Sequence, residues 1–108
     1  MKNLWIKKQF FDLIVQGKKT LEVRVSYPGL KKIKKGDVIG LNNKVKVKIK
    51  DIRTYSDFEK MILNEDPNAI LPESTSEQVL NLLKKIYPPK KQKLGVIVFE
   101  LDVKNKRN

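Results

Sequence analysis

The sequence contains no cysteine and no histidine among its 108 residues. These two absences exclude disulfide scaffolds, zinc fingers, cysteine nucleophiles, Ser-His-Asp triads and imidazole general bases. Any proton transfer would therefore use lysine, carboxylate, tyrosine or water. A metal ion would have only oxygen ligands, and no clustered carboxylate motif is present, so we predict neither a metal site nor a cofactor.

Long apolar runs are also absent. No stretch approaches the length of a membrane span, and residues 1–15 carry charged and aromatic side chains rather than the smooth apolar core of a signal peptide. A chain of this length can form one modest hydrophobic core. We expect a soluble, cytoplasmic, monomeric protein with a single domain over residues 1–103 and a frayed basic tail at residues 104–108.

Acidic residues are few relative to basic ones, with 12 Asp and Glu against 24 Lys and Arg and a net charge of +12. Residues 1–50 hold 14 basic and 3 acidic residues, residues 51–77 hold 2 and 7, and residues 78–108 hold 8 and 2. Such a surface favours polyanions, chiefly nucleic acid. Because 21 of the basic residues are lysine, genome composition or a thermophilic surface is an alternative explanation.

The hydrophobic pattern predicts several short strands and three short helices. Helices are expected before Gly17, after a capping box that begins at Ser56, and up to Ile86. Strands are expected at residues 4–6, 20–25, 38–41, 44–51 and 95–103, with Asn42 and Asn43 as a two-residue hairpin loop. The fold class is therefore α+β, and we predict a small mixed β-barrel with helices at its ends.

Charged side chains concentrate between Gly17 and Arg24. Glycine there ends the first helix, and Leu21, Val23 and Val25 alternate with polar residues on the strand that follows. The polar set, Thr20, Glu22 and Arg24, therefore shares one face of the strand, within reach of Lys19. This face is either a ligand-binding surface or an ordinary ion pair on a strand.

A basic stripe is expected on the next hairpin, where lysines at 44, 46, 48 and 50 alternate with apolar residues. The stripe either protects an exposed strand or contacts phosphates. Ile52 breaks the alternation, which predicts a bulge near Asp51 or Ile52.

Five motifs, in their order and spacing, resemble the ASCH domain family of the PUA-like superfamily. They are Gly17-Lys18-Lys19-Thr20-x-Glu22-x-Arg24, Ile33-Lys34-x-Gly36-Asp37-x-Ile39, Tyr55-x-x-Phe58, Ile86-Tyr87-Pro88 and Gly95-Val96-Ile97. The resemblance extends from Leu4 to Asp102. It implies a barrel of about six strands with a cleft beside the Gly-Lys-Lys-Thr turn, a shape that this superfamily uses to bind RNA and modified bases.

The resemblance also implies enzymes. Some small ASCH proteins are amidohydrolases that remove the acyl group from acetylcytidine with a lysine, a threonine and a glutamate, and another is a metal-dependent ribonuclease. Carried onto this sequence, the lysine is Lys19, and the glutamate is Glu65, with Asp66 and Glu73 as alternatives. The threonine position holds Glu22, so the threonine mechanism does not transfer directly.

Two alternatives for such an amidohydrolase stay open. Thr20 could supply the missing hydroxyl, or Glu22 could activate water while Lys19 stabilises the oxyanion. A carboxylate at position 22 would also pair with Lys19 or Arg24 and hold the lysine in its charged form.

Our first hypothesis is a module that binds RNA or a modified nucleoside, and the second is the amidohydrolase with Lys19, Glu22 and Glu65 as working groups. In the first, Glu22 and Arg24 contact a base or phosphate, Tyr27 stacks on a base, and lysines at 31, 32, 34, 46 and 48 follow the phosphates. Trp5 is assigned to the core in preference to stacking. The candidate binding residues are Lys18, Lys19, Thr20, Glu22, Arg24, Tyr27, Lys46 and Lys48.

Overall fold

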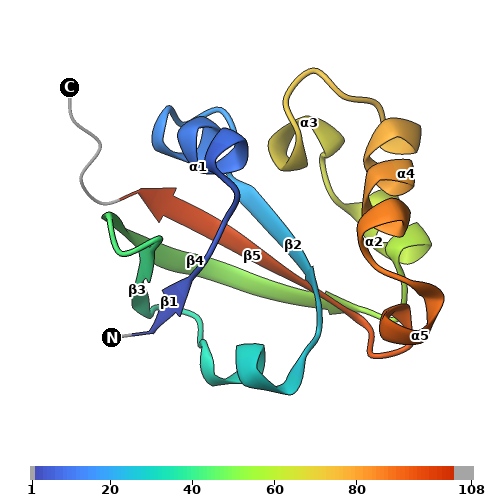
Figure 1. Ribbon diagram of the computed structural model, residues 1–108, viewed down its shortest axis with the longest axis horizontal. Helices are drawn as coiled ribbons and strands as arrows, with labels where there is room; N and C mark the ends of the chain where they lie inside the picture. The colour runs from blue at the N-terminus through green and yellow to red at the C-terminus, as the bar shows by residue number, and fades with distance from the viewer. Residues whose placement is uncertain (1, 104–108) are drawn as a thin grey trace.

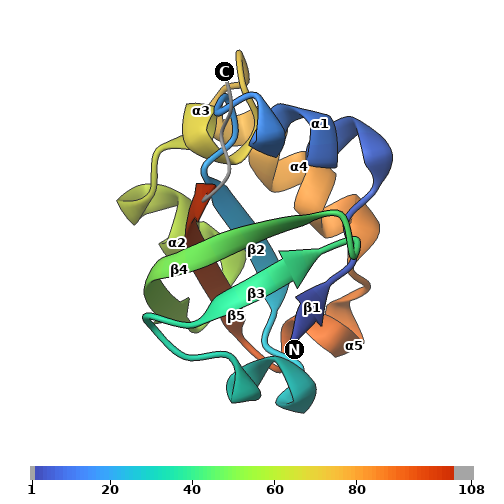
Figure 2. The same ribbon diagram turned by 90° about the vertical axis from the view of Figure 1, so that its left-hand side faces the viewer.

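The computed structural model describes residues 2–103, and within them five strands form one twisted sheet (Figure 2). The strand order is β1-β3-β4-β5-β2, with β1 parallel to β3 and all other neighbours antiparallel. The basic tail predicted at residues 104–108 lies outside the described residues. The strands are β1 (Asn3–Leu4), β2 (Leu21–Val25), β3 (Val38–Leu41), β4 (Val45–Tyr55) and β5 (Val96–Val103).

Helices cover both faces of this sheet (Figure 1). Helix α1 packs on one face, and α2, α3 and α4 gather on the other, so that β2 runs between α1 and α4. No helix in residues 2–103 is long and apolar enough to cross a bilayer. The helices are α1 (Lys8–Val15), α2 (Phe58–Asn64), α3 (Pro67–Ile70), α4 (Ser76–Ile86), α5 (Pro89–Gln92) and the 3₁₀ helix η1 (Pro28–Lys32).

The α+β class is confirmed, but the sheet is open and has five strands, so a barrel of about six strands is not what forms. Closure would require β1 and β2, the two edges, to pair. β1 has only two residues, and the two edge regions are joined instead by a side chain, because the Arg24 guanidinium donates to the carbonyl of Trp5 at 2.8 Å. A side-chain contact therefore takes the place of a backbone ladder.

The described residues contain five α-helices rather than three. The additional ones, α3 and α5, have four residues each and begin at a proline, whose fixed φ suits the first helical position. Sequence periodicity cannot identify helices of a single turn. The predicted cap at Ser56 also shifts by one residue, since Asp57 accepts the hydrogen bond from the Lys60 amide.

The local turn predictions are confirmed. Asn42 and Asn43 form the hairpin loop with φ of 52° and 56°, and the ladder between β4 and β5 shifts register between Ile49 and Asp51. This bulge keeps Ile52 on the same core face as Val47 and Ile49 and turns Tyr55 to the opposite face.

Strand alternation divides the interior into two cores. Leu21, Val23 and Val25 of β2 pack with α2, α3 and α4 in one core, whereas Ile97 and Phe99 of β5 belong to the other, beneath α1. Because Glu22 pairs with Phe99 and Arg24 pairs with Ile97 in the ladder, these two charged residues face the α1 side.

Gly95 permits the turn into β5. Its φ is +90°, and a Cβ added there would lie 3.3 Å from the carbonyl oxygen of Tyr55. We expect Gly95→Ala to lower the free energy of unfolding by about 1–2 kcal/mol, the cost of a left-handed backbone at a residue with a side chain. Urea unfolding followed by far-ultraviolet circular dichroism measures this. Gly29→Ala is the control, because a Cβ added at Gly29 would meet nothing within 4 Å and the φ of Gly29 is not positive; an equal loss in both variants would contradict the argument.

Candidate functional site

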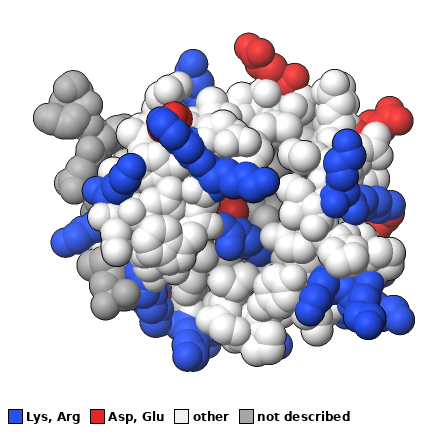
Figure 3. Space-filling model, viewed as in Figure 1, with Lys and Arg blue, Asp and Glu red and all other residues white. Residues whose placement is uncertain are grey.

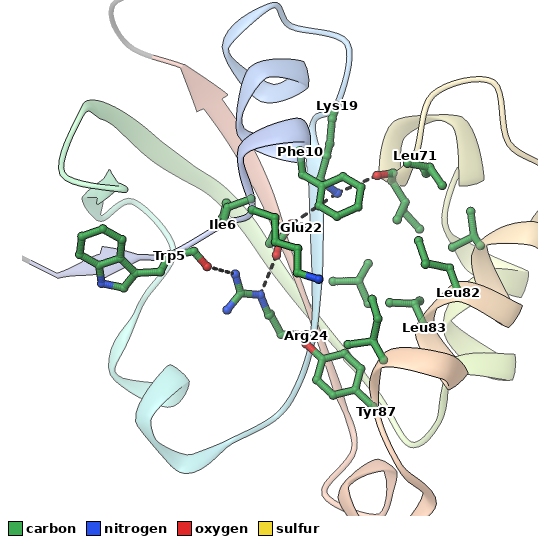
Figure 4. Close-up of a pocket in the computed structure, with 15 residues that line it drawn as sticks. Trp5, Ile6, Phe10, Lys19, Glu22, Arg24, Leu71, Leu82, Leu83 and Tyr87 are labelled. Atoms are coloured by element: carbon green, nitrogen blue, oxygen red, sulfur yellow. Dashed lines mark hydrogen bonds and ion pairs between the residues drawn. The ribbon is translucent and has the colours of Figure 1, made fainter.

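A pocket of about 220 Å³ lies along the outer edge of β2. It is bounded by the N-terminal segment and α1 on one side and by α3 and α4 on the other (Figure 4). The space-filling view shows a hollow in this face, with acidic and basic atoms at its bottom, mainly uncharged atoms around it and lysine or arginine further out (Figure 3). The charged side chains that line it are Lys7, Lys19, Glu22 and Arg24.

The edge of β2 supplies backbone groups to this pocket. The amide of Leu101 donates to the carbonyl of Thr20, and the amide of Ser26 donates to the carbonyl of Gly95, so the even-numbered residues of this segment bond to β5. In an antiparallel pair the intervening residues point the other way. The amide and carbonyl of Val23, which lines the pocket, therefore point away from β5 toward the pocket.

Lys19 lies at the bottom of the pocket with an exposed fraction of 5%. Its ammonium donates to the carbonyls of Leu21 at 2.7 Å and Ile70 at 2.6 Å and lies 3.4 Å from Oε1 of Glu22. Burial lowers the pKa of Lys19 below its ordinary value, and Glu22 acts in the opposite direction. Three acceptors match the three N–H groups of an ammonium, so this environment suits the charged form.

Glu22 connects the two cations of the pocket. Its Oε2 accepts from Nε of Arg24 at 2.6 Å, while its Oε1 faces Lys19, and its exposed fraction is 8%. Within residues 2–103, Arg24 donates only to Glu22 and to the carbonyl of Trp5. A guanidinium has five N–H groups, so donors on Arg24 are left for a ligand in the pocket.

Apolar and aromatic side chains form the walls of the pocket. Phe10 comes from α1, Leu82 from α4 and Tyr87 from the residue after α4, while Trp5 lies at the rim. Trp5 is 63% exposed, so its assignment to the core is wrong. Burial raises the pKa of the Tyr87 hydroxyl, which therefore stays protonated at neutral pH and able to donate.

Comparison with known proteins identifies the family. The ASCH domain model matches residues 4–103. The chain belongs to the ASCH domain family. Two solved structures are similar: the crystal structure of the hypothetical protein PH0355, with 31% identity and a TM-score of 0.87, and the solution structure of protein PF0455 from Pyrococcus furiosus, with 30% identity and a TM-score of 0.79. The matches cover 96% of this chain in both cases, and 100% and 97% of the two neighbours. No curated protein matches.

The predicted site residues of this ASCH domain fall into two groups. Lys19, Glu22 and Arg24 come together in the pocket. The others do not line it. Lys18 and Thr20 are exposed. Tyr27 packs against the core that β2 forms with α2, α3 and α4, and the ammonium of Lys91 lies 5.8 Å from its ring centroid.

The basic stripe of the ASCH domain is also remote from the pocket. Lys48 pairs with Asp102, which lies on the face of β5 opposite to Phe99, the partner of Glu22. Lys46, two residues earlier on β4, shares the face of Lys48. Two strand positions and a sheet face therefore separate these lysines from Glu22.

Glu65 belongs to a separate cluster. Its carboxylate accepts from Arg53 at 2.7 and 2.8 Å and from the hydroxyl of Tyr55 at 2.5 Å. Burial acts to raise the pKa of Glu65, but these hydrogen bonds outweigh it and hold the pKa below the ordinary value. Arg53 pairs with Val98, so the cluster lies on the sheet face opposite to Glu22. The structure therefore does not bring Glu65 together with Lys19.

Sequence reasoning missed Trp5, Phe10, Leu82 and Tyr87 as pocket residues. Their periodicity indicates helix faces and core. No local sequence pattern distinguishes an apolar side chain that lines a cavity from one that packs in the core. For Tyr87 a signal existed, because Ile86-Tyr87-Pro88 is one of the motifs that resemble the family.

We expect Glu22→Gln to lower the free energy of unfolding by about 3 kcal/mol at neutral pH, because it leaves two cations without their carboxylate. Since burial lowers the pKa of Lys19 in the folded state, the unfolded chain binds more protons between that lowered pKa and the ordinary lysine pKa, and stability rises with pH in this window. Loss of Glu22 lowers this pKa further. The deficit should therefore shrink as the pH approaches the ordinary lysine pKa.

Urea unfolding at neutral and alkaline pH measures both effects. Asp12→Asn is the control, because it removes the carboxylate of an exposed ion pair with Lys8. A deficit of Glu22→Gln that does not change with pH, or that equals the control, would show that the pair with Lys19 carries no such energy.

Proposed function

We propose that this ASCH domain binds single-stranded RNA by taking one unstacked base into the pocket beside β2. The observation that carries the proposal is the pairing of aromatic and apolar walls with donors from Arg24 and the backbone of Val23 at the bottom. Proteins recognise single-stranded RNA by this combination, stacking a splayed base and bonding to its edges.

The size of the pocket supports one base. Pockets for drug-sized ligands measure about 300–1,000 Å³, and this one measures about 220 Å³. The charge of the protein supports a polyanion, because a net charge of +12 attracts phosphates through counterion release. ASCH domains are associated with RNA binding in general, which agrees with both.

The state of the Lys19 ammonium favours binding over catalysis. Its three N–H groups face oxygen atoms of Leu21, Ile70 and Glu22, which hold it as an ammonium, and an ammonium has no lone pair with which to act as a base. In this role Lys19 neutralises Glu22 and holds the turn after α1 against α3. Glu22 in turn orients Arg24, whose remaining donors face the ligand.

Leu82→Phe tests the pocket without changing charge. Leu82 is half-buried in the pocket wall, whereas Leu63, 82% exposed on α2, does not line it. We expect Leu82→Phe to weaken binding of a random-sequence hexaribonucleotide about tenfold, or about 1.4 kcal/mol, by filling the pocket. Leu63→Phe should leave affinity unchanged. The fluorescence of Trp5, the single tryptophan at the rim, reports binding in both; equal affinities for the two variants would overturn the proposal.

A second candidate is the amidohydrolase that acts on acetylcytidine. Lys19 and Glu22 lie 3.4 Å apart in the pocket, which places a carboxylate base next to a cation. Thr20 is exposed and does not line the pocket, so a hydrolase here would use Glu22 to activate water and Lys19 to stabilise the oxyanion.

Acetylcytidine turnover, followed by the ultraviolet shift to cytidine, decides between the two functions. Binding alone predicts no turnover above that of Lys19→Ala, with circular dichroism used to show that the variant is folded. Turnover that disappears in the folded variant would instead make this protein a hydrolase in which glutamate replaces the threonine.

A further inference from the structure

An open groove of about 390 Å³ lies next to the pocket. Its basic side chains come from η1 and the residues after it, and its hydroxyl groups come from the sheet. The polar residues that line it are Lys31, Lys34, Lys35, Ser26, Thr54 and Asp51. In Figure 1 the segment with η1 lies beside the end of β2 that follows Arg24.

The groove carries net positive charge. Among residues 2–103, Lys31 and Lys34 form no ion pair, and Lys35 lies 3.8 Å from Asp51. The amide of Ile52 and the guanidinium of Arg53 hold the pKa of Asp51 below its usual range, so this carboxylate is ionised and already paired. Three lysines and one ionised carboxylate therefore line the groove.

Strand register joins the groove to the pocket. Ile97 lies between Arg24 on β2 and Thr54 on β4, as the direct partner of both. Ser26 follows Arg24 by two residues, which places it about 7 Å further along the same face. Arg24 lines the pocket, and Ile97, Thr54 and Ser26 line the groove, so the two cavities are adjacent on one face of the sheet.

We propose that this groove holds the sugar–phosphate backbone of the nucleotides that adjoin the base in the pocket, so that the ligand is a segment of single-stranded RNA rather than a free nucleoside. The inference rests on the proposed function. The sugar of the nucleotide whose base is in the pocket lies beside Arg24. Its phosphate then contacts Ser26 and Thr54, and the next phosphate lies near the ammonium groups of Lys31 and Lys34. Hydroxyl and ammonium donors are the usual partners of backbone phosphates.

The test compares ligands of increasing length. Titration of the four ribonucleosides, monitored by Trp5 fluorescence, identifies the preferred base. The mononucleotide, dinucleotide and tetranucleotide of that base are then titrated in the same way. We expect affinity to rise at least tenfold from the nucleoside to the tetranucleotide. Lys31→Gln/Lys34→Gln should remove most of this gain, leave nucleoside affinity unchanged and reduce the slope of log affinity against log salt by about 1.4, which is about 0.7 for each phosphate contact.

The matched control is Lys46→Gln/Lys48→Gln, which removes the same charge from exposed positions on the opposite face. It should change tetranucleotide affinity much less. Equal affinity for nucleoside and tetranucleotide, or equal losses in the two double variants, would overturn the groove while leaving a base in the pocket. Failure of the proposed function gives a different result. Leu82→Phe would then leave the binding of nucleoside and tetranucleotide unchanged, which overturns both the base in the pocket and the groove.

Discussion

The carboxylate of Glu22 is the interaction on which the site depends. It lies between the ammonium of Lys19 and the guanidinium of Arg24, and these two cations in turn bond to the carbonyls of Ile70 and Trp5. One buried anion thus connects the turn after α1, the edge of the sheet, α3 and the N-terminal segment. Burying charge is costly unless each group is paired, so these segments must assemble together for any of the three charges to be tolerated.

This network also explains why the sheet can remain open. An edge strand exposes unpaired backbone groups, and natural proteins cover or charge such edges. Here Lys19 bonds to the carbonyl of Leu21 at the edge of β2, and α1 and α4 flank what is left. The result is a strand edge that is sheltered but not filled, with the backbone of Val23 available at the bottom of a pocket. A closed barrel would have used these groups in a ladder.

Two charged clusters lie on opposite faces of the sheet, and they have different chemistry. The cluster of Arg53, Tyr55 and Glu65 satisfies its own carboxylate, which makes it a structural element that ties α2 to β4. The cluster around Glu22 leaves further donors on Arg24, which lines a cavity with aromatic walls. Only the second has both the space and the unsatisfied groups that recognition of a base needs. The proposed path for single-stranded RNA continues from this cluster past Ser26 into the groove lined by lysines.

The sequence by itself determined the local chemistry: the alternation of β2, the Asn-Asn hairpin, the bulge near Asp51 and the proximity of Lys19, Glu22 and Arg24 all follow from spacing along one strand or turn. The tertiary structure alone decided which distant residues join them. The other face of the sheet holds Glu65 and the lysines at 46 and 48. Strand register decides which face each of these residues shares with the rest of the sheet, and the sequence of one strand does not specify its register with the next. Trp5 and Tyr87 reached the pocket because the N-terminal segment and the end of α4 pack beside β2. Whether an apolar side chain fills a core or lines a cavity depends on the segments packed opposite to it, which no local pattern contains.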